Sequence, residues 1–211
     1  MPVLIMILSS VIAGILISSA IYAFTGFTFF NGTDRKTVVV DDMANADMTA
    51  LAYAVIEYIR DDDFIALSRV VHPEYGVTLS PYATINLATN RSYTAEEIAV
   101  LELGSDTETY VWGVYNGSGE PIVKTVTEYF AEFIPAADFI NAPVIGINQI
   151  VRSGNALENI TDVFPNVKFV DFHIPGGEPV EEFDWSSLRI GFEEYNGELR
   201  LTVIVFSKWT V

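Results

Sequence analysis

Cysteine is absent from this chain of 211 residues, which excludes disulfide bonds, thiol catalysis, thiolate metal sites and lipid attachment to an N-terminal cysteine. Basic residues are scarce, because 11 Lys and Arg stand against 28 Asp and Glu, and the formal net charge is −17. A field of that sign repels nucleic acid and anionic lipid headgroups. We therefore expect no nucleic-acid partner.

Charge of either sign is also missing before Asp34. Within this stretch, residues 3–24 have the sequence VLIMILSSVIAGILISSAIYAF. A helix of that length, at ~1.5 Å per residue, crosses a hydrocarbon layer of about 30 Å. The composition therefore predicts a long apolar helix over residues 1–30, suited to a membrane or to the core of a filament.

Three interpretations of this segment compete. A cleaved secretory signal needs a basic start and a shorter apolar run. A signal anchor usually carries basic residues on its cytoplasmic flank, whereas Arg35 and Lys36 follow the segment. The third interpretation is a mature chain from which a basic leader has been cut ahead of the apolar helix. It accounts for both the length of the segment and its missing charge.

Small residues recur four apart within the segment, at Ser10, Gly14 and Ser18. On a helix this spacing places them on one face, where small side chains let two backbones approach closely. Ser, Gly and Ala are also common in any membrane helix. We keep Ser10, Gly14 and Ser18 as the candidate helix-packing residues.

Residues 1–30 resemble the N-terminal helix of type IV pilins, especially the archaeal kind. Bacterial pilins carry a glutamate near the fifth mature position, where this chain has Ile5, and archaeal pilins generally lack it. The resemblance implies a helix that is held in the membrane before assembly and then bundles in a filament core. It also implies a β-rich head outside that core.

The rest of the chain is predicted to be a polar linker, residues 31–42, and one extracytoplasmic globular head, residues 43–211. The hydrophobic content of 50% is too high for a disordered chain. Periodicity and turn signals predict helices at residues 43–60, 64–72, 94–101 and 123–134, and strands at 76–87, 107–122, 167–174 and 187–209. Residues 135–165 are predicted to be mostly loop.

This order predicts an α+β fold in which helices pack on a curved antiparallel sheet. It resembles the cone of nuclear-transport-factor-2-like (NTF2-like) proteins, which often hosts a pocket. Residues 60–211 also resemble a group of uncharacterised bacterial secreted and lipid-anchored proteins, in stretches such as VWGVYNGSGEPIVKTVTEYFAEFI and DWSSLRIGFEEYNGELRLTVIVFSKWTV. That resemblance implies an extracytoplasmic location and no particular activity.

Candidate chemistry is sparse. His72 and His173 show no metal-ligand spacing and are interpreted as structural. Residues 61–63 are three aspartates, interpreted as a solvated helix end, and a second acidic group comprises Glu178, Glu181, Glu182 and Asp184. Glu193, Glu194 and Tyr195 precede the turn at Asn196 and Gly197 and are interpreted as hairpin surface. We therefore predict no catalytic residues, no metal site and no cofactor.

Three aromatic residues, Trp112, Phe172 and Trp185, either line a pocket of the cone or belong to its core. Four asparagines lie in N-glycosylation sequons within predicted loops, and these candidate sites are Asn31, Asn90, Asn116 and Asn159. Sequons of this kind are typical of surface proteins.

The leading functional hypothesis is a structural subunit of a type IV pilus-like filament on the cell surface. Self-association into a helical homopolymer would bury the apolar segment and expose the acidic head. The alternative is a membrane-anchored extracytoplasmic ligand-binding domain. An enzyme has the least support, because no nucleophile–base constellation is visible.

Overall fold

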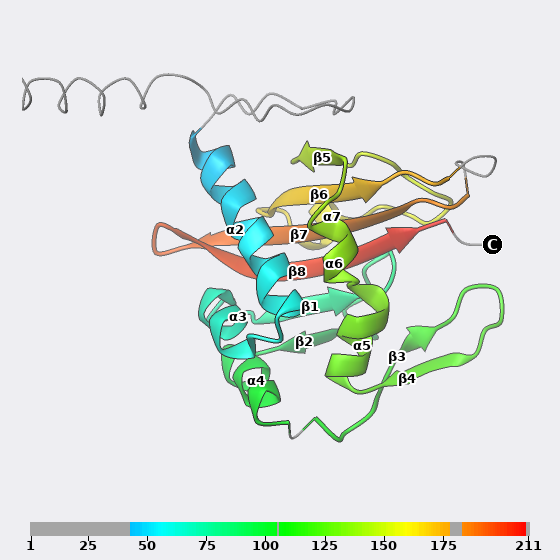
Figure 1. Ribbon diagram of the computed structural model, residues 1–211, viewed down its shortest axis with the longest axis horizontal. Helices are drawn as coiled ribbons and strands as arrows, with labels where there is room; N and C mark the ends of the chain where they lie inside the picture. Colours follow the sequence, from blue (N-terminus) through cyan, green and yellow to red (C-terminus); the bar gives the residue numbers. More distant parts are fainter. Residues whose placement is uncertain (1–42, 105, 178–182, 210–211) are drawn as a thin grey trace, which may run out of the picture. The chain divides into compact units, whose positions relative to one another are not determined.

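The computed structural model describes residues 43–104, 106–177 and 183–209, all of which belong to one compact unit (Figure 1). Its helices are α2 (Met43–Arg60), α3 (Phe64–Val70), α4 (Ala95–Ala99), the 3-10 helix η1 (Val100–Leu103), α5 (Val126–Phe133), α6 (Ala136–Phe139) and α7 (Ile160–Val163). Its strands are β1 (Val77–Ser80), β2 (Arg91–Tyr93), β3 (Tyr110–Val114), β4 (Pro121–Lys124), β5 (Val144–Ile147), β6 (Lys168–Ile174), β7 (Ser186–Tyr195) and β8 (Glu198–Lys208).

The predicted apolar helix of residues 1–30, with Ser10, Gly14 and Ser18, lies outside the described residues, as does the linker. Among the helices that are described, none is both long enough and apolar enough to cross a membrane. The long apolar helix of the predicted fold class therefore has no counterpart in this part of the chain.

Six strands form the main sheet in the order β2-β1-β8-β7-β6-β5, and β3 and β4 form a separate pair. The prediction of an antiparallel sheet was wrong at one junction, because β1 pairs with β8 in parallel, with Thr78 opposite Val203. The sheet is therefore mixed. The loop predicted for residues 135–165 was also wrong in part, because it contains α6, β5 and α7.

Local signals explain the ends of several helices. Thr94 and Glu97 form a capping box at the start of α4, and Thr125 and Glu128 form one at the start of α5. In each box the threonine oxygen accepts a backbone N–H and the glutamate accepts the N–H of the threonine. The side chain of Asp63 caps α3 by accepting the N–H of Ala66 at 2.8 Å. These caps fix where the helices begin.

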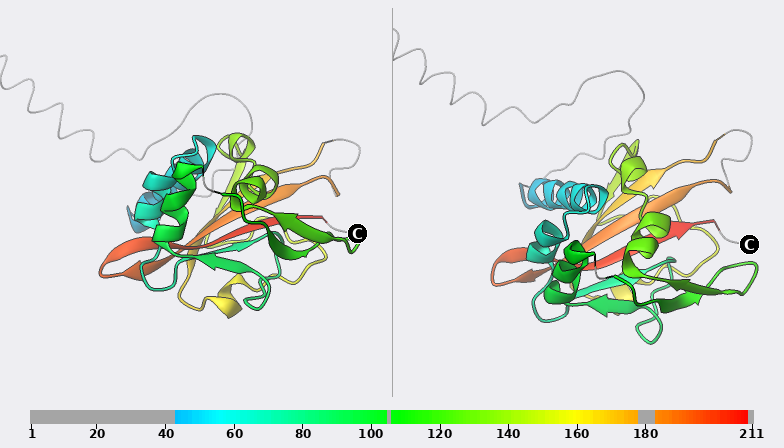
Figure 2. Two further views of the ribbon diagram at one scale, coloured as in Figure 1. Left: turned by 90° about the horizontal axis from the view of Figure 1, so that it is seen from below. Right: turned by 60° about the horizontal axis from the view of Figure 1, so that its bottom comes forward.

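Helices α2 to α6 lie on one face of the main sheet, whereas α7 lies on the other (Figure 2). We call these the helix face and the second face. Side chains of β6 alternate between them: Val170 and Phe172 belong to the large core under the helices, and Phe169 belongs to a smaller cluster with Ile160 of α7. Both faces of the sheet are therefore covered.

Candidate functional site

A groove opens at the end of the β7–β8 hairpin and has a volume of about 390 Å³. We call it the His72 groove. Its lining comes from the segment after α3, the start of β6 and the hairpin, and consists of His72, Glu74, Tyr75, Asn166, Lys168, Glu193, Glu194, Tyr195 and Leu199. The hairpin turns at Asn196 and Gly197, with φ angles of 53° and 82°, as a type I′ turn requires. The predicted turn is thus confirmed.

The imidazole of His72 is held in a fixed orientation. Its Nδ1 accepts the backbone N–H groups of Glu74 at 3.2 Å and Tyr75 at 3.1 Å. The ring stacks on Tyr75, with centroids 4.4 Å apart, and meets the ring of Tyr195 edge-on at 5.2 Å. Because Nδ1 is an acceptor, the ring proton is on Nε2. His72 is 2% exposed, and it is one of the residues that line the groove.

Charge in the groove is uneven. Glu74, Glu193 and Glu194 supply three carboxylates, and Lys168 supplies one ammonium group. Within the described residues, none of these four side chains forms an ion pair with another. In the described part of the chain, the groove therefore offers charged groups that form no ion pair.

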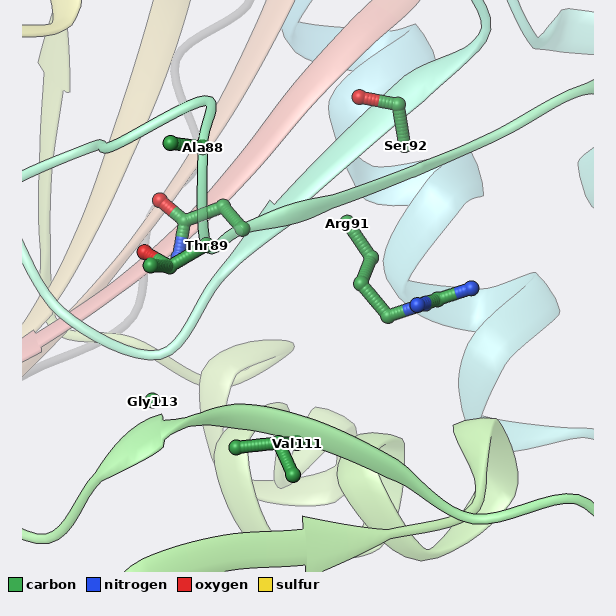
Figure 3. A pocket seen from close by; sticks show the side chains of 7 residues that line it. Ala88, Thr89, Arg91, Ser92, Val111 and Gly113 are labelled. Atoms are coloured by element: carbon green, nitrogen blue, oxygen red, sulfur yellow. The ribbon is translucent and has the colours of Figure 1, made fainter.

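A second cavity, of about 520 Å³, lies between β2 and β3 (Figure 3). It is lined by Asn90, the neighbouring Ala88 and Thr89, and by residues of the two strands, among them Val111 and Gly113. The guanidinium of Arg91 lies 3.7 Å from the ring centroid of Tyr110 on β3. This cavity is a gap between two strand edges and brings few chemically reactive groups together.

An ion network is buried on the second face. Arg189 of β7 lies opposite Asp171 of β6, and its Nε is 3.3 Å from Asp171 Oδ2. Its two terminal nitrogens donate to the carboxylate of Glu158, and Nη2 also donates to the carbonyl of Arg152 at 3.3 Å. The side chains of Arg189 and Asp171 are completely buried. The network ties the segment before α7 to the sheet.

Burial dominates the electrostatics of this network. It raises the pKa of Asp171 to about 6, although Arg189 and the N–H of Val151 act in the opposite direction. The Oδ1 atom of Asp171 has no hydrogen-bond partner among the described residues, which explains why burial outweighs the ion pair. Burial also raises the pKa of Glu158, against the influence of Arg189.

His173 lies two residue pairs further along the same two strands. Its Nδ1 is 2.9 Å from the Oγ of Ser187, and its ring is 5.8 Å from that of Trp185. Burial lowers its pKa to about 4, and the charges of Arg152 and Arg189 add to this effect. His173 is therefore a neutral, hydrogen-bonded side chain near neutral pH.

The structure separates the two histidines. Lys168, at the start of β6, shares the groove with His72, whereas His173 lies five residues further along that strand, or about 16 Å at ~3.3 Å per residue. The two histidines therefore have separate surroundings, one in the groove and the other beside Ser187 and Trp185. Among the described residues, no group of three or more His, Asp or Glu side chains is placed to hold a metal ion.

The aspartates of residues 61–63 have structural surroundings. Asp61 pairs with Arg60 at 2.8 Å, and Asp63 caps α3. Asp184 is exposed, whereas Glu178, Glu181 and Glu182 lie outside the described residues.

The three aromatic residues considered for a pocket are all buried. Trp112 stacks on Tyr129 with centroids 4.0 Å apart, and Phe172 meets Tyr53 edge-on at 5.1 Å. Both belong to the core under the helices. Trp185 packs beside His173 instead. All three side chains therefore fill the interior of the fold. The sequence left two alternatives for them, pocket lining and core, and the structure shows the core.

The sequon asparagines have different surroundings. Asn116 is exposed in the loop between β3 and β4, and Asn90 is half-buried beside β2. The side chain of Asn159 bonds both backbone groups of Ile85, accepting its N–H at 2.8 Å and donating to its carbonyl at 2.9 Å. Asn31 lies outside the described residues.

Neither a protein-family model nor a curated protein matches this sequence. Among solved structures, Aln2 from a Streptomyces species is similar with a TM-score of 0.36 and 8% identity, over 81% of this chain and 94% of that chain. A structure from Xanthomonas campestris, described as a calcium/calmodulin dependent protein kinase II association domain, is similar with a TM-score of 0.34 and 12% identity, over 85% of this chain and 97% of that chain. Structural similarity at this level supports no inference about function.

Proposed function

We propose that this protein is a structural subunit of a type IV pilus-like surface filament. The observation that carries the proposal is the division of charge along the chain: no charged residue precedes Asp34, and the whole net charge of −17 is carried from Asp34 onward. Burying the apolar segments of many copies together removes apolar area from water, which stabilises the assembly by roughly 25 cal/mol per Å². The acidic heads repel one another, so we expect contacts between heads to be sensitive to salt.

The fold of the head agrees with a role as a displayed domain. Residues 43–209 supply a sheet with both faces covered, so the head has its own core. We also propose that this head is an NTF2-like cone, because helices α2 to α6 cover one face of a six-stranded sheet (Figure 2). The proposal assigns no catalytic role to any residue.

Electron microscopy of material sheared from the producing cells tests the proposal, with mass spectrometry of the protein in it. We expect thin, uniform filaments made mainly of this chain. Gly14→Ile adds bulk in the series of small residues, so it should abolish filaments, whereas Ser19→Ile adds comparable bulk outside that series and should preserve them. Single particles that remain in the membrane fraction, with no filaments from the unmodified chain, would contradict the proposal.

The His72 groove favours a second candidate function, a membrane-anchored extracytoplasmic ligand-binding domain. Its unpaired carboxylates, its ammonium group and the oriented imidazole of His72 converge on one cavity. Polar groups that converge in a concavity are typical of small-molecule sites. Equilibrium binding to the purified full-length chain tests this function independently of filament formation.

A further inference from the structure

We propose that the His72 groove binds a small zwitterion, with an ammonium group at one end and a carboxylate at the other. This inference rests on the second candidate function and names its ligand class. Its basis is that the groove holds acceptors and donors together that have no partner among the described residues. A ligand of one charge would satisfy only half of them.

The acceptors are the carboxylates of Glu193 and Glu194, at the end of β7. Glu193 is half-buried and Glu194 is exposed. Within the described residues, neither side chain forms a hydrogen bond or an ion pair. Because adjacent residues of a strand point to opposite sides, a ligand ammonium group would pair with one of these carboxylates, through charge-assisted hydrogen bonds that are about twice as strong as neutral ones. The excess of carboxylates in the groove also favours a cationic group there.

The donors are the Nε2–H of His72 and the ammonium group of Lys168. The backbone bonds at Nδ1 hold the imidazole of His72 in place, and its Nε2 forms no hydrogen bond with the described residues although the residue is almost fully buried. This N–H is not among the fully buried atoms that lack a partner, so it reaches the groove, where a ligand carboxylate would accept it in a charge-assisted hydrogen bond. Lys168, also unpaired in the described chain, would neutralise the same carboxylate.

Two aromatic residues, Tyr75 and Tyr195, also line the groove. The ring of Tyr75 covers one face of His72, and Tyr195 meets it edge-on. Aromatic faces attract ammonium groups and also pack against methylene groups. A volume of about 390 Å³ lies within the range of small-molecule pockets, roughly 300–1,000 Å³. An aliphatic stem with a charge at each end therefore fits the arrangement.

Isothermal titration calorimetry of the full-length chain in detergent tests the proposal with three probes. The probes are 6-aminohexanoate, which has both ends, hexylamine, which lacks the carboxylate, and hexanoate, which lacks the ammonium group. We expect 6-aminohexanoate to bind at least about tenfold more tightly than either truncated probe. Equal affinities for 6-aminohexanoate and hexylamine would overturn the proposal, as would no binding of 6-aminohexanoate at about 10 mM.

Variants assign each end of the ligand. The double variant Glu193→Gln and Glu194→Gln should lower the affinity for 6-aminohexanoate by about tenfold or more. Lys168→Met should lower that affinity similarly, without changing the affinity for hexylamine. Glu120→Gln is the matched control, because Glu120 is an exposed carboxylate between β3 and β4 that does not line the groove. An equal loss of affinity in Glu120→Gln would show a general charge effect and contradict the site.

Two further titrations, with Ca²⁺ and with a neutral sugar, distinguish a wrong ligand class from a wrong binding function. If either binds in place of 6-aminohexanoate and the double glutamate variant abolishes that binding, the zwitterion is wrong and the binding function stands. If none of these probes binds, both the zwitterion and the groove as a small-molecule site are contradicted. Filament formation by the same chain is scored separately by electron microscopy.

Discussion

The two faces of the main sheet are covered in different ways. On the helix face, aromatic and aliphatic side chains such as Phe172 and Trp112 pack under α2 to α6. On the second face, a small apolar cluster lies beside a buried network of Arg189, Asp171 and Glu158. Apolar packing depends mainly on volume, whereas buried charges depend on every partner being present. The two faces should therefore respond differently to substitutions of similar size.

The largest loss of stability is expected from Arg189→Met, which keeps most of the side-chain volume and removes the charge. Asp171 and Glu158 then lose their cationic partner, and a broken buried ion pair typically costs about 3–5 kcal/mol. Urea unfolding monitored by circular dichroism measures the loss. Arg200→Met, which removes a partly exposed cation paired with the exposed Glu198, should cost much less.

The triple variant Arg189→Met, Asp171→Leu and Glu158→Leu sharpens this test. Because all the charges are removed together, much of the lost free energy of unfolding should return. If the triple variant is less stable than Arg189→Met alone, buried charge is not the cause of the loss.

The next-largest loss of stability is expected from Asn159→Ala. This change removes both hydrogen bonds to the backbone of Ile85, and buried groups left without partners cost about 1–3 kcal/mol. Asn116→Ala is the control, because Asn116 belongs to another sequon and lies exposed in a hairpin loop. Thermal unfolding should distinguish the two variants, and equal melting temperatures would contradict the role of Asn159.

A smaller effect is expected on the helix face from Phe172→Leu. The change retains an apolar side chain of similar volume and loses the edge-on contact with Tyr53. Swaps of this kind usually cost under about 1.5 kcal/mol. A loss in urea unfolding as large as that of Arg189→Met would contradict the contrast between the faces.

The smallest net effect on the unmodified chain concerns pH, because two contributions oppose each other. The pKa of Asp171 is raised from 3.8 to about 6, so the folded state binds more protons between these values and this contribution to stability falls as pH rises through them. The pKa of His173 is lowered from 6.5 to about 4, so its contribution rises with pH over nearly the same window. The two contributions oppose each other.

Single substitutions should separate these slopes. Between pH 4 and pH 6.5, the stability of Asp171→Asn should rise more steeply with pH than that of the unmodified chain. The stability of His173→Gln should rise less steeply or fall. Urea unfolding at a series of pH values measures both, and parallel curves for all three proteins would contradict the pKa shifts.

Features encoded within a few residues could be predicted from the sequence. The spacing of Met48, Ala52, Val55 and Ile59 indicates α2, and all four are buried. The capping signal at Thr94 and the hairpin turn at Asn196 are likewise confirmed. Each of these signals acts through contacts within one turn of backbone.

Features that depend on distant pairing were missed. Nothing local in the sequence of β1 indicates that Thr78 pairs in parallel with Val203. The pairing of Asp171 with Arg189 depends on the β6–β7 register, which the sequence does not show. A charged residue inside each of two apolar strands was nevertheless a sequence feature that could have indicated a buried ion pair. The His72 groove combines three separate chain segments, so the individual interpretations of His72 and Glu193 as structural or surface residues could not reveal it.

The position of β8 has a consequence for biosynthesis. This strand is the last of the main sheet in sequence, yet it lies between β1 and β7 and joins them. As the chain emerges during synthesis or export, β1 therefore has no parallel partner until nearly the whole head has emerged, and its unpaired edge is exposed to other chains until then. Pairing between such distant segments also slows folding. The head should consequently fold late and cooperatively, and a nascent chain stalled before β8 should bind chaperones.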